Sequence, residues 1–183
     1  NVGGIDDSAL FGKKLTINGL IGVAVGKAIH QCSADESKKI PSITDVSVDF
    51  GFENKQEAEK HITLGDFGYF KSDFIPFGDQ MLKSKALDDR VGCVVMLELL
   101  QEKSKIDYTC VFTVQEEIGT RGATVSAYTV NPDYAIVIET TTASDIPDTP
   151  DHKKVCKTGN GAVVSFMDRA TLYDRANLQA ATF

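Results

Sequence analysis

The hydrophobic pattern of the first 80 residues is that of short β-strands. In Leu15–Gly26, β-branched residues stand on both sides of Asn18-Gly19, a turn dipeptide that favours a β-hairpin. Ser42–Phe50 alternates apolar and polar residues, which is typical of a half-buried strand. We expect a further strand at Ile62–Phe70. These segments predict a small all-β domain, a barrel or a sandwich, over residues 1–80.

A short helix is expected among these strands. Asn54 followed by Glu57 resembles a capping box, in which side chains satisfy the first backbone N–H groups of a helix, here Lys55–His61. Gly78-Asp79 begins a break in the chain. The all-β domain therefore ends near residue 80.

The pattern changes in residues 81–183. Asp88 or Asp89 can cap a helix that runs to about Lys103. Its apolar residues surround most of its circumference: Val91, Val94, Val95, Met96, Leu97, Leu99 and Leu100. A helix that is apolar on nearly every side is expected to be buried.

Apolar strands and helices alternate beyond this helix. Strands are expected at Tyr108–Val114 and Tyr134–Ile138, with a helix near Ala123–Thr129 between them. Such alternation predicts a parallel or mixed sheet that is covered on its faces. The tail adds an expected strand at Val163–Phe166 and a helix at Asp174–Ala181. The fold class is therefore α/β plus all-β.

Composition and charge exclude several classes of partner. The 183 residues carry a net charge of -7, and the isoelectric point is about 4.9, whereas nucleic acid and anionic membranes require basic surface. No apolar run approaches the roughly 20 residues of a membrane span, and the start carries no secretion signal. We therefore expect neither nucleic acid nor a membrane as a partner.

The cysteines indicate the compartment. Cys32, Cys93, Cys110 and Cys156 are widely spaced and form no C-x-x-C pair, which argues against zinc-finger and thioredoxin chemistry. Two of them, Cys93 and Cys110, lie in apolar segments, where a reduced buried thiol is expected. This usage is typical of a reducing, cytoplasmic environment.

Acidic residues recur at the points where catalytic groups gather in α/β proteins. Asp88-Asp89 opens the expected buried helix, Glu116-Glu117 follows one apolar strand, and Glu139 closes the next. Ligand sites of open α/β sheets lie outside the carboxyl ends of the strands. Carboxylates that converge there repel one another unless a cation neutralises them. The pattern favours a hydrolytic metal site.

Each acidic group also has a purely structural interpretation. Aspartates before an apolar run most often cap a helix, and a glutamate at the end of a strand is most often solvated. The three histidines, His30, His61 and His152, are not beside the acidic groups in the sequence, and His30 and His61 fall in the β-rich half, where a structural role is expected. The metal interpretation is favoured because βαβ geometry would bring all the acidic groups to one face.

Three linked motifs resemble a known family of peptidases. They are Lys85–Gly92, Val114–Ala123 and Glu139–Pro147, and they occur in the order and spacing found in the glutamyl and deblocking aminopeptidases of the tetrahedral, dinuclear metallopeptidase family. Gly3–Asp6 and Gly22–His30 also resemble that family's inserted β-barrel domain. The resemblance implies a partial zinc-peptidase-like α/β/α sandwich at 81–183, with a β-barrel insert that governs assembly at 1–80.

The resemblance also implies a role for each acidic residue. Asp88 would bridge two divalent metal ions, zinc or cobalt, and the Asp88-Asp89 peptide would be cis. Glu116 would be the general base and acid, while Glu117 would bind one ion and Glu139 the other. Asp89 would orient a metal-bound imidazole. Peptides would be the substrates, and a homo-oligomer, a dodecamer for the family, would be the assembly.

The resemblance places this chain in the central half of such an enzyme. The family takes two histidine ligands from segments upstream of the barrel insert and near the C-terminus, and neither is among these 183 residues. We therefore expect the chain alone to hydrolyse aminoacyl anilides no faster than its Glu116→Gln variant.

Two other functions fit part of the pattern. A glycoside hydrolase such as an endoglucanase also uses two carboxylates, but these face each other across the substrate, whereas Glu116 and Glu117 are neighbours. The chain also contains no Trp with which to stack sugars. An oligomer-assembly module without catalysis is the non-enzymatic alternative, and metal binding would separate it from an aminopeptidase.

Overall fold

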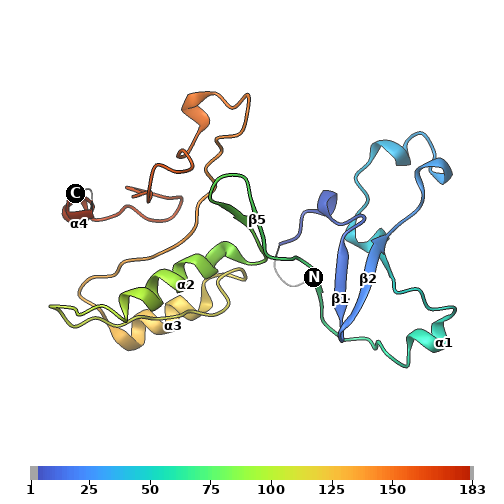
Figure 1. Cartoon of the computed structure of the whole chain (residues 1–183), viewed down its shortest axis with the longest axis horizontal. Helices are drawn as coiled ribbons and strands as arrows, with labels where there is room; N and C mark the ends of the chain where they lie inside the picture. Colours follow the sequence, from blue (N-terminus) through green and yellow to red (C-terminus); the bar gives the residue numbers. More distant parts are fainter. Residues whose placement is uncertain (1–3, 182–183) are drawn as a thin grey trace. The chain divides into compact units, whose positions relative to one another are not determined.

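The computed structural model describes residues 4–181 in two compact units, Asn1–Ile138 and Glu139–Phe183. The secondary structure is mixed, with α-helices and small β-sheets, as Figure 1 shows. The strands are β1 (Lys14–Ile17), β2 (Leu20–Val25), β3 (Ser47–Asp49), β4 (Gly68–Phe70), β5 (Ile75–Phe77) and β6 (Met81–Lys83). The α-helices are α1 (Lys55–Ala58), α2 (Leu87–Leu99), α3 (Arg121–Val130) and α4 (Arg175–Ala181), with short 3-10 turns η1 (Asp7–Ala9), η2 (Ile29–Gln31), η3 (Glu36–Lys38), η4 (Ile43–Asp45) and η5 (Asp151–Lys153).

The predicted hairpin is confirmed. β1 and β2 pair antiparallel, and Ile17 lies opposite Leu20 across the turn. Asn18 (φ 49°) and Gly19 (φ 82°) both have positive φ, as the tight turn of a two-residue hairpin requires. The Asn18 amide donates to the carbonyl of His61 (3.1 Å) and to Asp66 Oδ2 (2.8 Å). The turn is thereby tied to the segment that precedes β4.

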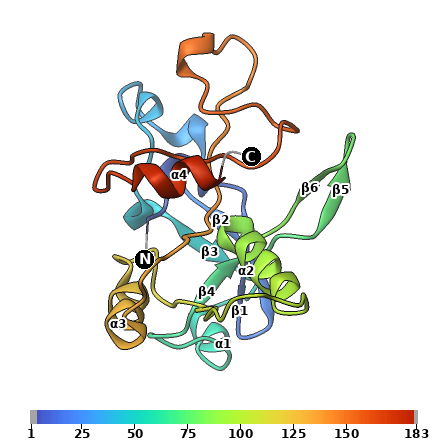
Figure 2. The same cartoon turned by 90° about the vertical axis from the view of Figure 1, so that its left-hand side faces the viewer.

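The β-rich part is an open sheet. Its strand order is β3-β2-β1-β4, with every neighbouring pair antiparallel, and β5 and β6 form a separate hairpin (Figures 1 and 2). Within the described residues the four strands do not close into the expected barrel. The chain turns at Gly78, between β5 and β6, so the predicted break is the turn of a hairpin.

Two predicted strands are shorter than their patterns indicated. Ser42–Phe50 begins with η4, because Ser42 Oγ accepts from the Thr44 N–H (3.4 Å) and Asp45 accepts from the Ser42 N–H (3.0 Å). This local capping competes with strand pairing and leaves only β3. In the same way, Asp66 accepts from the Thr63 N–H (2.7 Å), and β4 starts only at Gly68.

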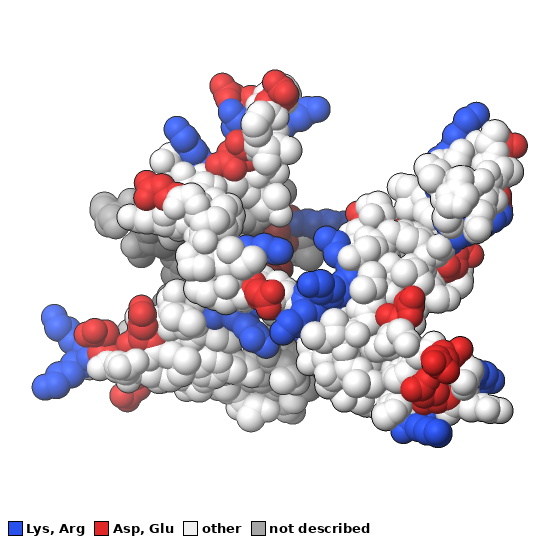
Figure 3. Space-filling view, turned by 45° about the vertical axis from the view of Figure 1, so that its right-hand side comes forward, with Lys and Arg blue, Asp and Glu red and all other residues white. Residues whose placement is uncertain are grey.

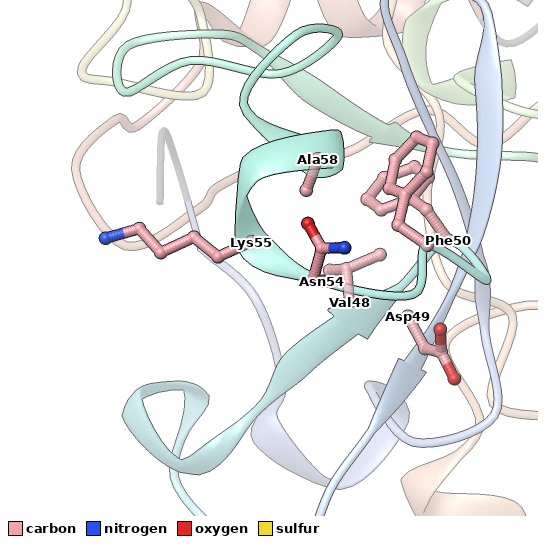
Figure 4. A pocket seen from close by; sticks show the side chains of 7 residues that line it. Val48, Asp49, Phe50, Asn54, Lys55 and Ala58 are labelled. Atoms are coloured by element: carbon pink, nitrogen blue, oxygen red, sulfur yellow. The ribbon is translucent and has the colours of Figure 1, made fainter.

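The predicted cap of α1 is confirmed on one side. Asn54 Oδ1 accepts from the Glu57 N–H at 3.0 Å, but the Glu57 carboxylate accepts from Glu53 rather than from Asn54, and the helix is one turn long. A hollow of about 330 Å³ lies between α1 and β3. In Figure 4, Asn54 and Ala58 face its centre, while Lys55 points away. Its lining contains none of the predicted catalytic residues.

The expectation that α2 is buried is wrong for the described chain. The helix forms as predicted, but Val91, Val94 and Leu97 keep 47%, 52% and 52% of their surface exposed. The best-buried apolar side chains are instead Leu10, directly after η1, and Ala24, within β2. On the face in Figure 3, small groups of acidic and basic side chains are separated by wide uncharged areas.

The predicted parallel sheet is also absent from the described part of the chain. Tyr108–Val114, Tyr134–Ile138 and Val163–Phe166 run without strand partners among residues 4–181. A strand forms only where a neighbour satisfies its backbone groups, and the apolar pattern does not specify that neighbour. The predicted helices near 123–129 and 174–181 are confirmed as α3 and α4. Within residues 4–181, none of the helices combines the length and the hydrophobicity that a membrane span requires.

Candidate metal centre

Asp88 and Asp89 lie at an irregular start of α2. Neither has helical backbone angles: Asp88 has φ -86° and ψ 108°, and Asp89 has φ -114° and ψ 50°. The peptide bond between them is cis, which confirms what the family resemblance implied. Regular helix therefore begins at Arg90, directly after the acidic pair.

The two aspartates have different surroundings. Asp89 is half-buried, and its Oδ1 accepts the N–H of the buried Gly92 at 3.0 Å, so it caps the regular part of α2. Asp88 is exposed, and its carboxylate makes no hydrogen bond or ion pair with any described residue. The structural interpretation thus holds for Asp89, while Asp88 is available to bind a cation.

Glu116 and Glu117 lie in a compact loop between the apolar segment 108–114 and α3. The carbonyl of Glu116 accepts the N–H groups of Gly119 (2.9 Å) and Thr120 (2.8 Å). The Gly122 N–H donates to the carbonyl of Val114 at 3.0 Å, which closes the loop at its base. The first turn of α3 therefore fixes the position of the two glutamates relative to the apolar segment 108–114.

Both glutamate side chains are exposed. Among the described residues neither one has a hydrogen-bond or ion-pair partner, and the same is true of the Arg121 side chain. A hollow of about 380 Å³ lies next to this loop, and Gln115, Arg121 and Gly122 are part of its lining. The loop thus presents two unpaired carboxylates beside a hollow.

Glu139 is the first residue of the second unit and is exposed. Its Oε1 accepts the N–H of Thr140 at 3.0 Å. Further along the same motif, Asp145 accepts the N–H of Thr158 at 2.8 Å, and this hydrogen bond holds the pKa of the Asp145 carboxyl below its ordinary value. Asp145 therefore ties together two ends of the loop that follows Glu139.

The histidines have other surroundings. His61 stacks on Phe52 with ring centroids 5.3 Å apart and planes within 3° of parallel, as expected of a structural histidine. His30 lies in η2 and His152 in η5. The acidic motifs of this chain thus offer oxygen donors, which suit divalent cations, whereas zinc sites usually add imidazole. The donor set fits part of a divalent metal centre.

Two glycines at the site were not singled out by the sequence pattern. A Cβ on Gly122 would lie 2.5 Å from the Val114 carbonyl oxygen and 2.6 Å from the Val114 nitrogen. A Cβ on Gly92 would lie 2.7 Å from Asp89 Oδ1 and closer still to Oδ2. Both residues belong to the acidic motifs, but only the three-dimensional contacts reveal why a side chain is missing there.

Comparisons with known proteins agree with these motifs. The model of a family described as M42 glutamyl aminopeptidase matches residues 1–181. A protein of Acetivibrio thermocellus with the name "Putative aminopeptidase" is 33% identical over 174 residues, which are 93% of this chain and 50% of that protein. The chain spans about half the length of the curated relatives it matches.

Solved structures give the same result. An aminopeptidase from the archaeon Desulfurococcus kamchatkensis is 35% identical and superposes with a TM-score of 0.78, over 87% of this chain and 45% of that one. The TET1 peptidase of Pyrococcus horikoshii is 29% identical with a TM-score of 0.75, over 98% and 55% of the two chains. The latter can assemble into a tetrahedron or a large octahedral shell.

Proposed function

Because this chain belongs to the M42 glutamyl aminopeptidase family, we propose that it is the part of a metal-dependent aminopeptidase that carries most of the acidic groups of the active centre. The family match over residues 1–181, which includes all three acidic motifs, carries this proposal. Its substrates would be short peptides, from which N-terminal residues are removed.

We propose that Asp88, Glu117 and Glu139 would hold two divalent ions, zinc or cobalt, and that Asp88 would serve both ions. Two observations support these residues as ligands: Asp88 and Glu117 have no protein partner among the described residues, and carboxylate oxygens are suitable donors for divalent cations. When bound, such ions polarise the scissile carbonyl and make water more acidic.

Glu116 is proposed to move the proton. It takes a proton from the attacking water and returns it to the nitrogen of the leaving peptide, so a single carboxylate serves as base and then as acid. This role requires a carboxylate that binds no metal ion. Glu116 and Glu117 can divide the two tasks, because side chains of consecutive residues at the end of an extended segment point in different directions. Asp89 would orient a metal-bound imidazole.

The glycoside hydrolase alternative is less favoured. A hydrolase of that kind needs two carboxylates about 5–9 Å apart on opposite sides of a sugar ring. Glu116 and Glu117 are adjacent in one loop, and the family to which the chain belongs consists of peptidases. A non-catalytic assembly module would leave the exposed carboxylates of Asp88 and Glu117 without a function.

Assembly and location are part of the proposal. We propose that the whole protein forms a homo-oligomer, a dodecamer by family resemblance, and the assembly of the Pyrococcus horikoshii relative supports this. The four cysteines are free thiols, which supports a reducing, cytoplasmic location.

The role of Glu116 is tested by Glu116→Gln in the whole protein that carries this chain. We expect kcat for aminoacyl anilides to fall about 10²–10⁴-fold, because the proton acceptor is lost. Bound cobalt should stay at the wild-type level. Glu102→Gln, an exposed carboxylate beyond α2, is the matched control and should leave kcat unchanged. Full activity in the Glu116 variant would refute this assignment.

A further inference from the structure

Gly92 lies against the Asp89 carboxylate. It is the buried residue of α2 and donates its N–H to Asp89 Oδ1 at 3.0 Å. A Cβ at this position would approach both carboxylate oxygens, Oδ1 at 2.7 Å and Oδ2 more closely, well inside van der Waals contact at about 3.5 Å. The space that a side chain would fill is thus occupied by the carboxylate of the residue three positions earlier.

This contact has a definite consequence for the two oxygens of Asp89. Oδ1 is held by the Gly92 N–H, while Oδ2 receives no hydrogen bond from any described residue. The group that would collide with a Cβ is the end of a side chain, so α2 can persist in a variant if the carboxylate turns away. A side chain at position 92 would therefore redirect Asp89 more than it would unfold the helix.

We infer that Gly92 is a positioning residue, which keeps the Asp89 carboxylate in the orientation that leaves Oδ2 open to accept an imidazole N–H from a metal ligand. This inference rests on the proposed function, in which Asp89 orients such a ligand. Partners of this kind typically contribute 10–100-fold to metal affinity. At an ordinary glycine inside a helix, replacement by alanine has a favourable effect, because alanine stabilises the helix.

A double-mutant cycle in the whole protein that carries this chain tests the inference. The variants are Gly92→Ala, Asp89→Ala and the double variant, and Glu98→Ala, exposed on the same helix, is the control. Two quantities are measured: the amide exchange rate of residue 92 in the metal-free whole protein, corrected for the intrinsic rate of its side chain, and the Kd of the whole protein for Co²⁺. The first does not depend on any metal.

Gly92→Ala should speed exchange at residue 92 by at least tenfold and weaken Co²⁺ binding by about tenfold or more. In the Asp89→Ala background, Gly92→Ala should neither speed exchange further nor weaken Co²⁺ binding further. The inference is overturned if Gly92→Ala leaves both unchanged, or if its effects simply add to those of Asp89→Ala. If the wild-type whole protein binds no Co²⁺, the proposed metal centre fails, and the exchange cycle alone decides whether Gly92 positions Asp89.

Discussion

The carboxylates of this chain separate into two groups by their immediate contacts. Asp66, Asp89 and Asp145 accept backbone N–H groups and brace turns or a helix start. Asp88, Glu116 and Glu117 have no such partner among the described residues. The sequence alone does not separate the two groups. Only the contacts show which acidic side chains stabilise the fold and which are available for chemistry.

The contact of Asp145 predicts a pH dependence. The hydrogen bond from Thr158 lowers the folded pKa of this carboxyl. Because the folded pKa lies below the unfolded one, the stabilising contribution is complete above the ordinary carboxyl pKa of about 3.9 and is lost as the pH falls through the lowered folded value.

The amide resonance of Thr158, followed by NMR from pH 6 to pH 2, measures this dependence. We expect its chemical shift to titrate with a midpoint below 3.9. In Asp145→Asn the titration should disappear, while Asp133→Asn, an exposed aspartate outside this loop, should leave it unchanged. A midpoint at or above 3.9 in the wild-type chain would contradict the bracing role.

At the level of elements, the close approach of α3 to the apolar segment 108–114 fixes the Glu116–Glu117 loop. Gly122→Ala would place a Cβ 2.5 Å from the backbone oxygen of Val114, and backbone cannot move aside as a side chain can. We expect a loss of about 1–3 kcal/mol in the free energy of unfolding, the usual range for overpacking. Urea denaturation measures it.

Ala123→Ser, at the exposed next position of α3, is the control for this variant and should change the free energy of unfolding by less than about 0.5 kcal/mol. If Gly122→Ala is as stable as the wild type, the loop is not fixed by that approach. Another contact would then have to fix the positions of Glu116 and Glu117.

Elements specified by local signals could be predicted, and those that depend on distant partners could not. Asn18-Gly19 specifies its own hairpin turn, and α2 and α3 follow from their own composition. The apolar segment 108–114 has a strand pattern but finds no paired neighbour among the described residues. The alternation of apolar and polar residues in Ser42–Phe50 conceals the cap at Ser42, which shortens the strand.

The candidate site shows the same division. Its motifs could be read from the sequence because each one lies at the start of a helix or after an apolar segment. The contacts of Gly92 and Gly122 could not, since they depend on the irregular backbone at Asp89 and on the path of residues 113–114. The metal-ligand roles of Asp88, Glu117 and Glu139 remain predictions.

For the whole molecule, the most informative quantity is its exposed surface. Many large apolar side chains among the described residues are exposed. Among them, Tyr128 and Ile136 each keep 90% of their surface exposed. Large apolar areas are normally covered by other protein.

We therefore expect the isolated chain to associate with itself. Light scattering coupled to size-exclusion chromatography should give a mass well above 19.8 kDa, and the mass should increase with protein concentration. Val125→Lys together with Tyr128→Lys, on the exposed part of α3, should reduce the mass, whereas Lys60→Glu on the β-rich part should not. A monomer at every concentration would contradict this expectation.

Equilibrium binding of Co²⁺ to the 183-residue chain is the most direct test of the central claim, that carboxylates of these motifs hold metal while Glu116 moves the proton. The wild type, Asp88→Asn, Glu116→Gln and the surface control Asp35→Asn are compared by calorimetry. Asp88→Asn should weaken binding at least tenfold, whereas Glu116→Gln and Asp35→Asn should change it less than about twofold. If Asp88→Asn binds Co²⁺ as the wild type does, the acidic motifs do not form the proposed metal centre.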